Sequence, residues 1–359
     1  MHEASTRRSE AVAEGTLASW RVASPWFDWV MAVLSAWLVG GAFVDGWAHT
    51  HGKVDTSFFT PWHAVLYSGF LAVAGALVGA LLHQRARRGT RPHALPSGYT
   101  LSLLGAVLFG GGGVGDLLWH TFFGIEKGVE ALFSPTHILL ACGVWLMVGG
   151  PFRAAWQRPA PPAPRWHQHL PPLLSLTWML AACTFMTQVA HPVVYLWGGG
   201  RVPAAGSWLW QAAGVLGLLW DTVLLLGFVL LPLRRWTLPA GALTLVIGLN
   251  AVAMGFLHRG AYPLLPVAAR VLAGLGADGV AAWLQPSAQR PHAWRLFAGL
   301  VPILVTTLHF GTLEVTGGVW WSVHVWAGTI VLTGVVGLLV SMLLVPPPWP
   351  GMAQEGLTQ

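Results

Sequence analysis

Two aspartates and four histidines occur in one pattern that appears twice in the first part of the chain. The pattern is Asp-x3-His followed by Ser/Thr-Pro-x-His. The first copy is Asp45, His49 and Thr60-Pro61-Trp62-His63; the second is Asp116, His120 and Ser134-Pro135-Thr136-His137. Carboxylates and neutral imidazoles bind transition-metal ions. The repeat therefore predicts metal ligation by Asp45, His49 and His63 at one site, and by Asp116, His120 and His137 at a second or shared site.

The spacing places these side chains where they can share an ion. Residues i and i+4 lie on one helix face, so each Asp-x3-His pair can reach one ion from the end of a helix. A Thr or Ser N-cap followed by Pro begins the next helix and puts its histidine in the first turn. The helix dipole disfavours a carboxylate at a C-terminus and keeps a histidine in the first turn neutral. A bound cation would relieve the cost of the carboxylate, although local hydrogen bonding is the simpler explanation for either pair alone.

The elements that must position these residues are membrane helices. The chain has 359 residues, 55% of them hydrophobic and 9% charged, with a mean hydropathy of +0.60. Soluble domains carry about a quarter charged residues, so water-soluble classes are excluded. Apolar stretches predict an all-α, polytopic membrane helix bundle of about ten transmembrane helices, with a duplicated hairpin in the first four. The predicted spans are 27–48, 62–83, 98–120, 134–152, 171–196, 207–232, 237–257, 262–284, 294–311 and 318–345.

Arginines in alternate loops predict the orientation. By the positive-inside rule both termini are cytoplasmic, and both motif copies face outward. The net charge of +6 thus reports topology and does not indicate nucleic-acid binding. The abundance of Arg suits a bacterial, multi-pass protein of the plasma (inner) membrane. We divide the chain into a cytoplasmic segment (1–25), the metal-binding hairpins (26–153), a Pro-rich loop (154–170), the remaining bundle (171–345) and a cytoplasmic tail (346–359).

Other polar residues on the predicted outer side suggest supporting roles. Glu126, Glu130 and Glu314 are candidate catalytic residues that move protons. His51 and Asp55 are candidate extra ligands, with ordinary loop polarity as the alternative. Asp221 and Asp278 lie within apolar stretches, where they are candidate proton carriers or hydrogen-bond acceptors for neighbouring helices.

The repeated motif resembles the metal sites in the C subunit of copper membrane monooxygenases, which oxidise methane, ammonia or short alkanes. Those sites have the form Asp/Asn-x3-His-x12–13-His. Asp45-x3-His49-x13-His63 fits this spacing, whereas Asp116-x3-His120-x16-His137 keeps the order with a longer gap. The resemblance covers about residues 45–137 and implies copper and oxidation chemistry.

The expected function is that of an integral membrane metalloprotein, first of all a copper- or iron-type oxidoreductase acting on a small or lipophilic substrate. Copper is favoured, and iron or zinc would also suit these ligands. One alternative is a divalent metal ion transporter, for which the ion is the substrate. Another is a metal-binding assembly or sensor subunit. Bis-histidine haem is a further alternative. The expected partners are the lipid bilayer and a second membrane subunit or copy of this chain, with no nucleic acid.

Overall fold

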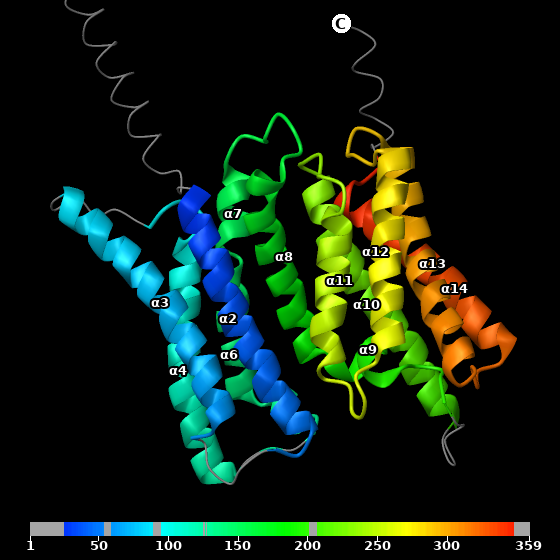
Figure 1. Cartoon of the computed structure of the whole chain (residues 1–359), viewed down its shortest axis with the longest axis horizontal. Coiled ribbons are helices and arrows are strands. Elements are labelled where there is room, and N and C mark those ends of the chain that lie inside the picture. The colour runs from blue at the N-terminus through cyan, green and yellow to red at the C-terminus, as the bar shows by residue number, and fades with distance from the viewer. Residues whose placement is uncertain are drawn as a thin grey trace, which may run out of the picture. The chain divides into compact units, whose positions relative to one another are not determined.

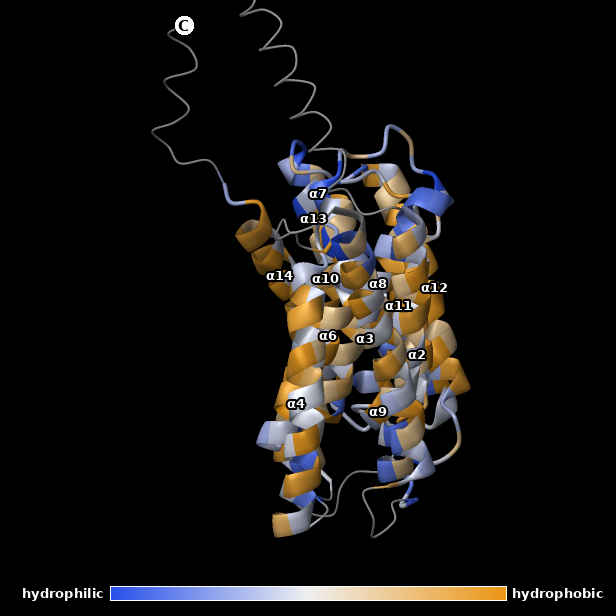
Figure 2. Cartoon of the chain, turned by 90° about the vertical axis from the view of Figure 1, so that its left-hand side faces the viewer, coloured by the Kyte–Doolittle hydropathy of each residue, from blue (hydrophilic) through white to orange (hydrophobic). Residues whose placement is uncertain are grey.

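The computed structural model describes residues 25–53, 59–88, 95–124, 126, 128–200 and 207–347. In these ranges the regular elements are helices joined by turns and loops (Figure 1). Eight of these helices are long and apolar enough to cross a membrane, and one bent pair adds a ninth candidate span. Hydrophobic residues run along the helices, and hydrophilic residues gather toward their ends (Figure 2). The prediction of an all-α, polytopic helix bundle is confirmed.

The chain divides into two compact units, one ending at Met186 and the other beginning at Thr187. In the first unit α8 packs on α2, α6 and α7, so this unit extends beyond the duplicated hairpins. The predicted spans 27–48, 62–83, 98–120 and 134–152 coincide with α2, α3, α4 and the α6–α7 pair. The helices of this unit are α2 (Pro25–Thr50), α3 (Pro61–Arg88), α4 (Thr100–Phe123), α5 (Glu130–Phe133), α6 (Pro135–Val148), α7 (Gly150–Gln157) and α8 (Trp166–Met186).

The predicted span 134–152 is a bent helix pair. The axes of α6 and α7 meet at 41°, at Gly149. Pro151 follows directly in the first turn of α7 and has no N–H to continue the hydrogen-bond ladder of α6. The bend is therefore a consequence of the Gly-Gly-Pro sequence at this point.

Glycines bring α2 and α3 into backbone contact. A Cβ on Gly41 would lie 2.7 Å from the Cα of Leu66, and a Cβ on Gly69 would lie 2.8 Å from the Cα of Leu38. Side chains larger than hydrogen at these two positions would separate the helices. The close approach fixes the position of the α2 end that carries Asp45 relative to the start of α3.

The second hairpin has glycines at the same places. Gly112 of α4 faces Leu140 of α6, where an added Cβ would lie 3.2 Å from the leucine side chain. A Cβ on Gly143 of α6 would lie 2.8 Å from Phe109 of α4. These contacts correspond one by one to those of the first hairpin, so the duplication extends from the motif to the helix packing.

The two hairpins pack with approximate two-fold pseudo-symmetry. Helix α2 of the first hairpin corresponds to α4 of the second, and α3 corresponds to α6. Exchange of the two hairpins therefore converts the contact between α2 and α6 into the contact between α4 and α3, and both contacts are present. Tyr99 and Asp28 occupy equivalent positions of the two hairpins, and Tyr99 Oη donates a 2.6 Å hydrogen bond to Asp28 Oδ1. Equivalent residues meet in this way only near a symmetry axis. The motif-bearing ends of both hairpins therefore lie at one end of the bundle (Figure 1).

The predicted span 171–196 is wrong at both ends. Helix α8 begins earlier, at Trp166, and ends at Met186; residues 188–190 form a 3-10 turn, and α9 spans Pro192–Tyr195. Pro192 cannot donate the backbone hydrogen bond that a continuous helix needs, and His191 caps the new helix instead. The left-handed backbone of Leu196, with φ of 47°, ends α9.

The second unit contains α9 and five longer helices. These are α10 (Ser207–Leu233), α11 (Ala242–Gly255), α12 (Leu264–Leu284), α13 (Pro291–Thr316) and α14 (Val323–Leu344). The predicted span 237–257 is too long, because α11 has 14 residues and reaches about 21 Å at 1.5 Å per residue. Such a helix is shorter than the hydrocarbon core of a bilayer, which is about 30 Å thick.

Candidate metal centres

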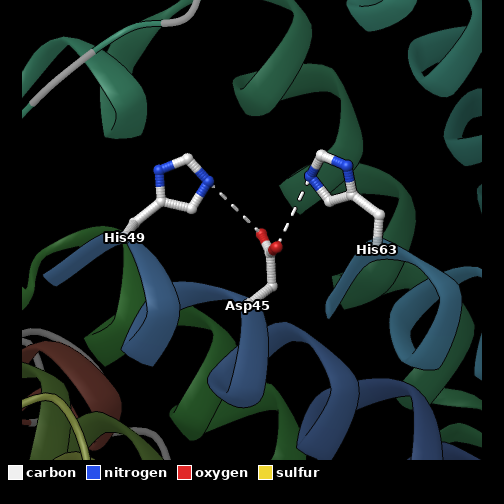
Figure 3. A group of neighbouring side chains, drawn as sticks. All are labelled: Asp45, His49 and His63. Carbon is white, nitrogen blue, oxygen red and sulfur yellow. Dashed lines mark ion pairs between the residues drawn. The ribbon is translucent and has the colours of Figure 1, made fainter. Parts of the chain in front are cut away.

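The first predicted ligand group, Asp45, His49 and His63, comes together at the junction of α2 and α3. His49 lies one turn after Asp45, and its Nε2 is 3.9 Å from Asp45 Oδ2. His63 Nε2, from the first turn of α3, is 3.4 Å from Asp45 Oδ1. Both imidazoles turn toward the carboxylate (Figure 3). We call this half-buried group the first trio.

The second trio, Asp116, His120 and His137, has the same arrangement on α4 and α6. Nε2 of His120 lies 3.4 Å from Asp116 Oδ2, and Nε2 of His137 lies 3.4 Å from Asp116 Oδ1. The Asp116 side chain is 2% exposed, whereas that of Asp45 is 17% exposed. The second trio is thus the more deeply buried copy.

The distances within each trio suit ligands of a common ion. One ligand atom from each residue can be chosen so that all three lie within 4.8 Å of one another. Two atoms bound at about 2.1 Å to one tetrahedral ion lie about 3.4 Å apart. Three of the four Nε2–carboxylate distances are 3.4 Å, which is longer than the usual N–H···O hydrogen bond of about 2.7–3.2 Å. Both trios could therefore hold a metal ion.

Charge balance separates these two aspartates from others in the helices. Buried Asp28 lies 2.5 Å from Arg158, and buried Asp221 accepts a 2.7 Å hydrogen bond from Arg270. Asp45 and Asp116 form ion pairs with histidines only, as far as the structure describes the chain. Imidazoles that are neutral would leave the charge of a carboxylate uncompensated, which is costly in an apolar setting. A bound cation would supply the missing charge.

The predicted caps place the second histidine of each trio. Thr60 Oγ1 accepts a 3.1 Å hydrogen bond from the backbone N–H of His63, and Ser134 Oγ accepts one of 3.4 Å from that of His137. Each cap precedes a proline at the start of its helix. The cap-Pro-x-His sequence therefore fixes the histidine in the first turn, as predicted.

The two trios lie close enough to influence one another. His49 of the first trio is within electrostatic range of His120 and His137 of the second. Tyr67 of α3 is within electrostatic range of both Asp45 and Asp116. Tyr67 is not part of the repeated motif, although its place one turn after His63 is a usable signal in the sequence.

The three predicted catalytic glutamates have different surroundings. Glu126 Oε2 lies 3.0 Å from Nδ1 of His120, beside the second trio. Glu130 is exposed at the start of α5. Glu314 belongs to the second unit, where its exposed carboxylate accepts a hydrogen bond from the backbone N–H of Val319. Glu126 alone of the three is brought next to a trio within the first unit.

Four other histidines bond to backbone carbonyls or are exposed. Nδ1 of His51 lies 3.0 Å from the carbonyl oxygen of Trp47 and that of His258 lies 2.7 Å from Val194 O. Nε2 of His309 lies 2.9 Å from the carbonyl oxygen of Trp197, and His324 is exposed. Asp55 lies outside the described residues. None of these four histidines belongs to either trio.

The two aspartates of the second unit are hydrogen-bonded to neighbouring helices, which is one of the two predicted alternatives. Asp278 accepts hydrogen bonds from the backbone N–H groups of Leu243 and Thr244 and from the Thr244 hydroxyl, so it caps the start of α11 from α12. Asp221 pairs with Arg270. The sequence did not reveal that pairing, because the two residues lie on α10 and α12, far apart along the chain.

Fold and site together define a multi-pass helical membrane protein with two Asp/His groups that could bind metal ions. Comparison with family models, curated proteins and solved structures gives no match to this chain.

Proposed function

We propose that this chain is a membrane oxidoreductase that binds copper or iron at the two trios and acts on a small or lipophilic substrate. The proposal is supported by two carboxylates, Asp45 and Asp116, that pair only with imidazoles among the described residues and have histidine Nε2 atoms at ligand spacing. We place both ions at the extracytoplasmic face of a plasma membrane, because the arginine-rich loops lie on the opposite side.

Each trio supplies three protein ligands, and this number favours a reactive centre. Structural metal sites are usually closed by four protein ligands, whereas catalytic sites leave a position for water or substrate. Two imidazoles and one carboxylate are also the ligand set of many non-haem iron sites, and the motif spacing resembles that of membrane copper sites. The bound metal would supply the redox chemistry, and the trios would hold it beside the lipid phase from which an apolar substrate arrives.

The apolar core of the first unit argues against a carrier that moves the ion across the bilayer. Between the trios and the opposite end of the bundle, the buried side chains are mostly apolar, such as Leu38, Leu77 and Phe109. The buried hydroxyl residues there carry no charge; they are Ser35, Ser102, Ser175 and Thr177. A transporter needs polar groups along its path, with binding near the midplane. A fixed centre at one face needs no such path.

Metal analysis of the purified chain tests the proposal. Wild type in detergent is expected to hold up to two copper or iron ions per chain, and Asp45→Asn and Asp116→Asn are each expected to remove one. His51→Ala is the matched control, because His51 lies at the same end of α2 but outside the trio. Absence of tightly bound metal from wild type, or loss in the His51 variant as large as in the aspartate variants, would overturn the assignment.

Two further assays test the reaction class. Membranes containing wild type are expected to consume O₂ in the presence of a reductant and a short-chain hydrocarbon or ammonia, and Asp116→Asn membranes are expected not to. Sealed vesicles are expected to show no metal uptake. Uptake that depends on Asp45 and Asp116, without oxidation, would make the chain a metal carrier instead.

A further inference from the structure

The two trios are equivalent in sequence but differ in the hydrogen bonds that surround their ligands. In the second trio both histidine Nδ1 atoms lie near partners, and the carboxylate also accepts a bond from a hydroxyl. In the first trio, Trp62 stands at the position of Thr136. These contacts determine how firmly a ligand is held, and partners of this kind change metal affinity by about 10–100-fold.

His120 is held in the tautomer that binds metal through Nε2. Its Nδ1 lies 3.0 Å from the Glu126 carboxylate and 3.3 Å from the carbonyl oxygen of Gly124. The carbonyl oxygen of Gly124 can only accept a hydrogen bond, so Nδ1 carries the proton in that bond, and the Glu126 carboxylate lies beside it at ion-pair distance. The lone pair is then on Nε2, which faces Asp116. Glu126, His120 and the ion would form the carboxylate–histidine–metal arrangement common in metal sites.

His137 belongs to a chain of hydroxyl groups that ends on the same carboxylate. Its Nδ1 lies 2.8 Å from Ser134 Oγ, Ser134 Oγ lies 3.3 Å from Thr136 Oγ1, and Thr136 donates a 2.9 Å bond to Asp116 Oδ1. If Nδ1 of His137 donates to Ser134 and Ser134 donates to Thr136, every proton in the chain has an acceptor. That arrangement again leaves the lone pair on Nε2, toward Asp116.

The first trio has a different residue where the second has Thr136. That position is Trp62, directly before His63, and the Trp62 indole N–H donates to the carbonyl oxygen of Lys53 rather than to Asp45. The first trio is also more open at two of its three residues. The His49 side chain is 23% exposed against 7% for His120, and that of Asp45 is 17% exposed against 2% for Asp116, whereas those of His63 and His137 are 14% and 19% exposed. Water and competing ligands therefore reach the first trio more easily.

We propose that the two centres bind metal with unequal strength: the Asp116 centre retains its ion, whereas the Asp45 centre exchanges it with the surroundings. Thr136 and the deeper burial of Asp116 produce the difference, and Glu126 is a further positioning residue of the Asp116 centre. This inference rests on the proposed metal-binding function and adds a division of roles, with a resident ion beside an exchangeable one.

Chelator titration of the purified full-length chain tests the inference. Copper-loaded protein in detergent is exposed to increasing chelator, and retained copper is counted after desalting. We expect release in two steps, of one ion each. Asp45→Asn should abolish the early step, and Asp116→Asn the late one. Glu126→Gln and Thr136→Val should each lower the copper affinity measured from the late step by about 10–100-fold. Glu126→Asp should recover part of the affinity lost in Glu126→Gln. Glu130→Gln, a change at an exposed neighbour, is the control and should leave both release steps unchanged.

The possible outcomes are distinct. Wild type that binds no copper or iron would overturn both the proposed function and this inference. Three results would overturn only the inference. They are release of both ions in a single step, loss of the early step in Asp116→Asn, and an unchanged late step in both Glu126→Gln and Thr136→Val. Loading with Co²⁺ gives a second measurement: Glu126→Gln should alter the visible spectrum of the tightly held ion alone. A size-exclusion profile for each variant separates lost affinity from lost folding.

Discussion

Tyr99 donates a 2.6 Å hydrogen bond to Asp28, and the two residues hold equivalent positions in the duplicated hairpins. The bond joins the starts of α2 and α4, at the end of the bundle away from the trios. Arg158 completes the pair by contacting the other oxygen of Asp28. This contact near the pseudo-symmetry axis is one of those that join the two halves of the first unit.

Tyr99→Phe should therefore lower the stability of the first unit without changing its metal content. The variant leaves one oxygen of buried Asp28 without its hydroxyl donor, at a cost of about 1–3 kcal/mol. Thermal unfolding in detergent should show a lower midpoint. Tyr195→Phe serves as the control, because Tyr195 is 42% exposed and stacks on Trp197 through its ring. Equal midpoints for both variants would contradict this role of the bond.

Gly41→Ala should disturb the first trio, whereas Gly40→Ala should not. A Cβ on Gly41 would lie 2.7 Å from Leu66 Cα and force α2 and α3 apart, whereas a Cβ on Gly40 meets nothing within 4 Å. Overpacking of this kind costs about 1–3 kcal/mol. Metal content and thermal midpoint should fall in the Gly41 variant only. The same comparison can be made in the second hairpin with Gly112 and Gly111, where Gly111 is the open position.

Gly113→Ala should alter both metal centres at once. A Cβ there would lie 2.9 Å from the Tyr67 hydroxyl and displace the ring. Tyr67 is within electrostatic range of both trio aspartates, so its displacement changes the surroundings of two ions. The Cu²⁺ electron paramagnetic resonance spectrum should change for both ions. Gly111→Ala is the control, and a change confined to one ion would show that Tyr67 serves a single trio.

Asp278→Ala should destabilise the second unit because it removes the cap of α11. The carboxylate accepts two backbone N–H bonds and one hydroxyl bond at the start of that helix. Hydrogen bonds to a charged group contribute about 1.5–3 kcal/mol each, and Asn should preserve part of this because its amide oxygen still accepts. Unfolding midpoints should fall in the order wild type, Asn, Ala. Lost oxidation activity at an unchanged midpoint would instead indicate a proton carrier.

The second unit should lose stability in mild acid because of His191. Burial lowers the pKa of His191 to about 4, against the opposing effect of Asp221, and Arg270 and His309 lower it further. The unfolded chain binds this proton near its ordinary pKa of about 6.5, so the stabilisation is present above that value and decreases as pH falls toward 4. His191→Asn keeps an N-cap for α9 and has no titrating ring. The variant should show a smaller loss of thermal midpoint between pH 6.5 and 4, and an unchanged loss would assign the effect to other groups.

The sequence by itself determined the membrane class, most of the helices and the membership of both Asp/His groups. Hydrophobic length identifies a spanning helix without knowledge of its neighbours, and i,i+4 spacing together with a cap-Pro-x-His start is local geometry. Local signals also mark the two errors: Pro192 interrupts the span predicted at 171–196, and α11 is shorter than its apolar stretch. Apolar residues favour burial in lipid whether or not the backbone is helical throughout.

Only the tertiary structure decided which charges have partners. Asp28, Asp221 and Asp278 lie in apolar stretches, as the trio aspartates do, but the first two pair with arginines from other helices and the third caps a neighbouring helix. The tertiary structure likewise gave the second trio its Glu126 and Thr136 contacts. Such partners come from separate elements, and their distances depend on helix packing, which periodicity and composition do not encode. Charge compensation in a low-dielectric interior is therefore a property of the folded bundle.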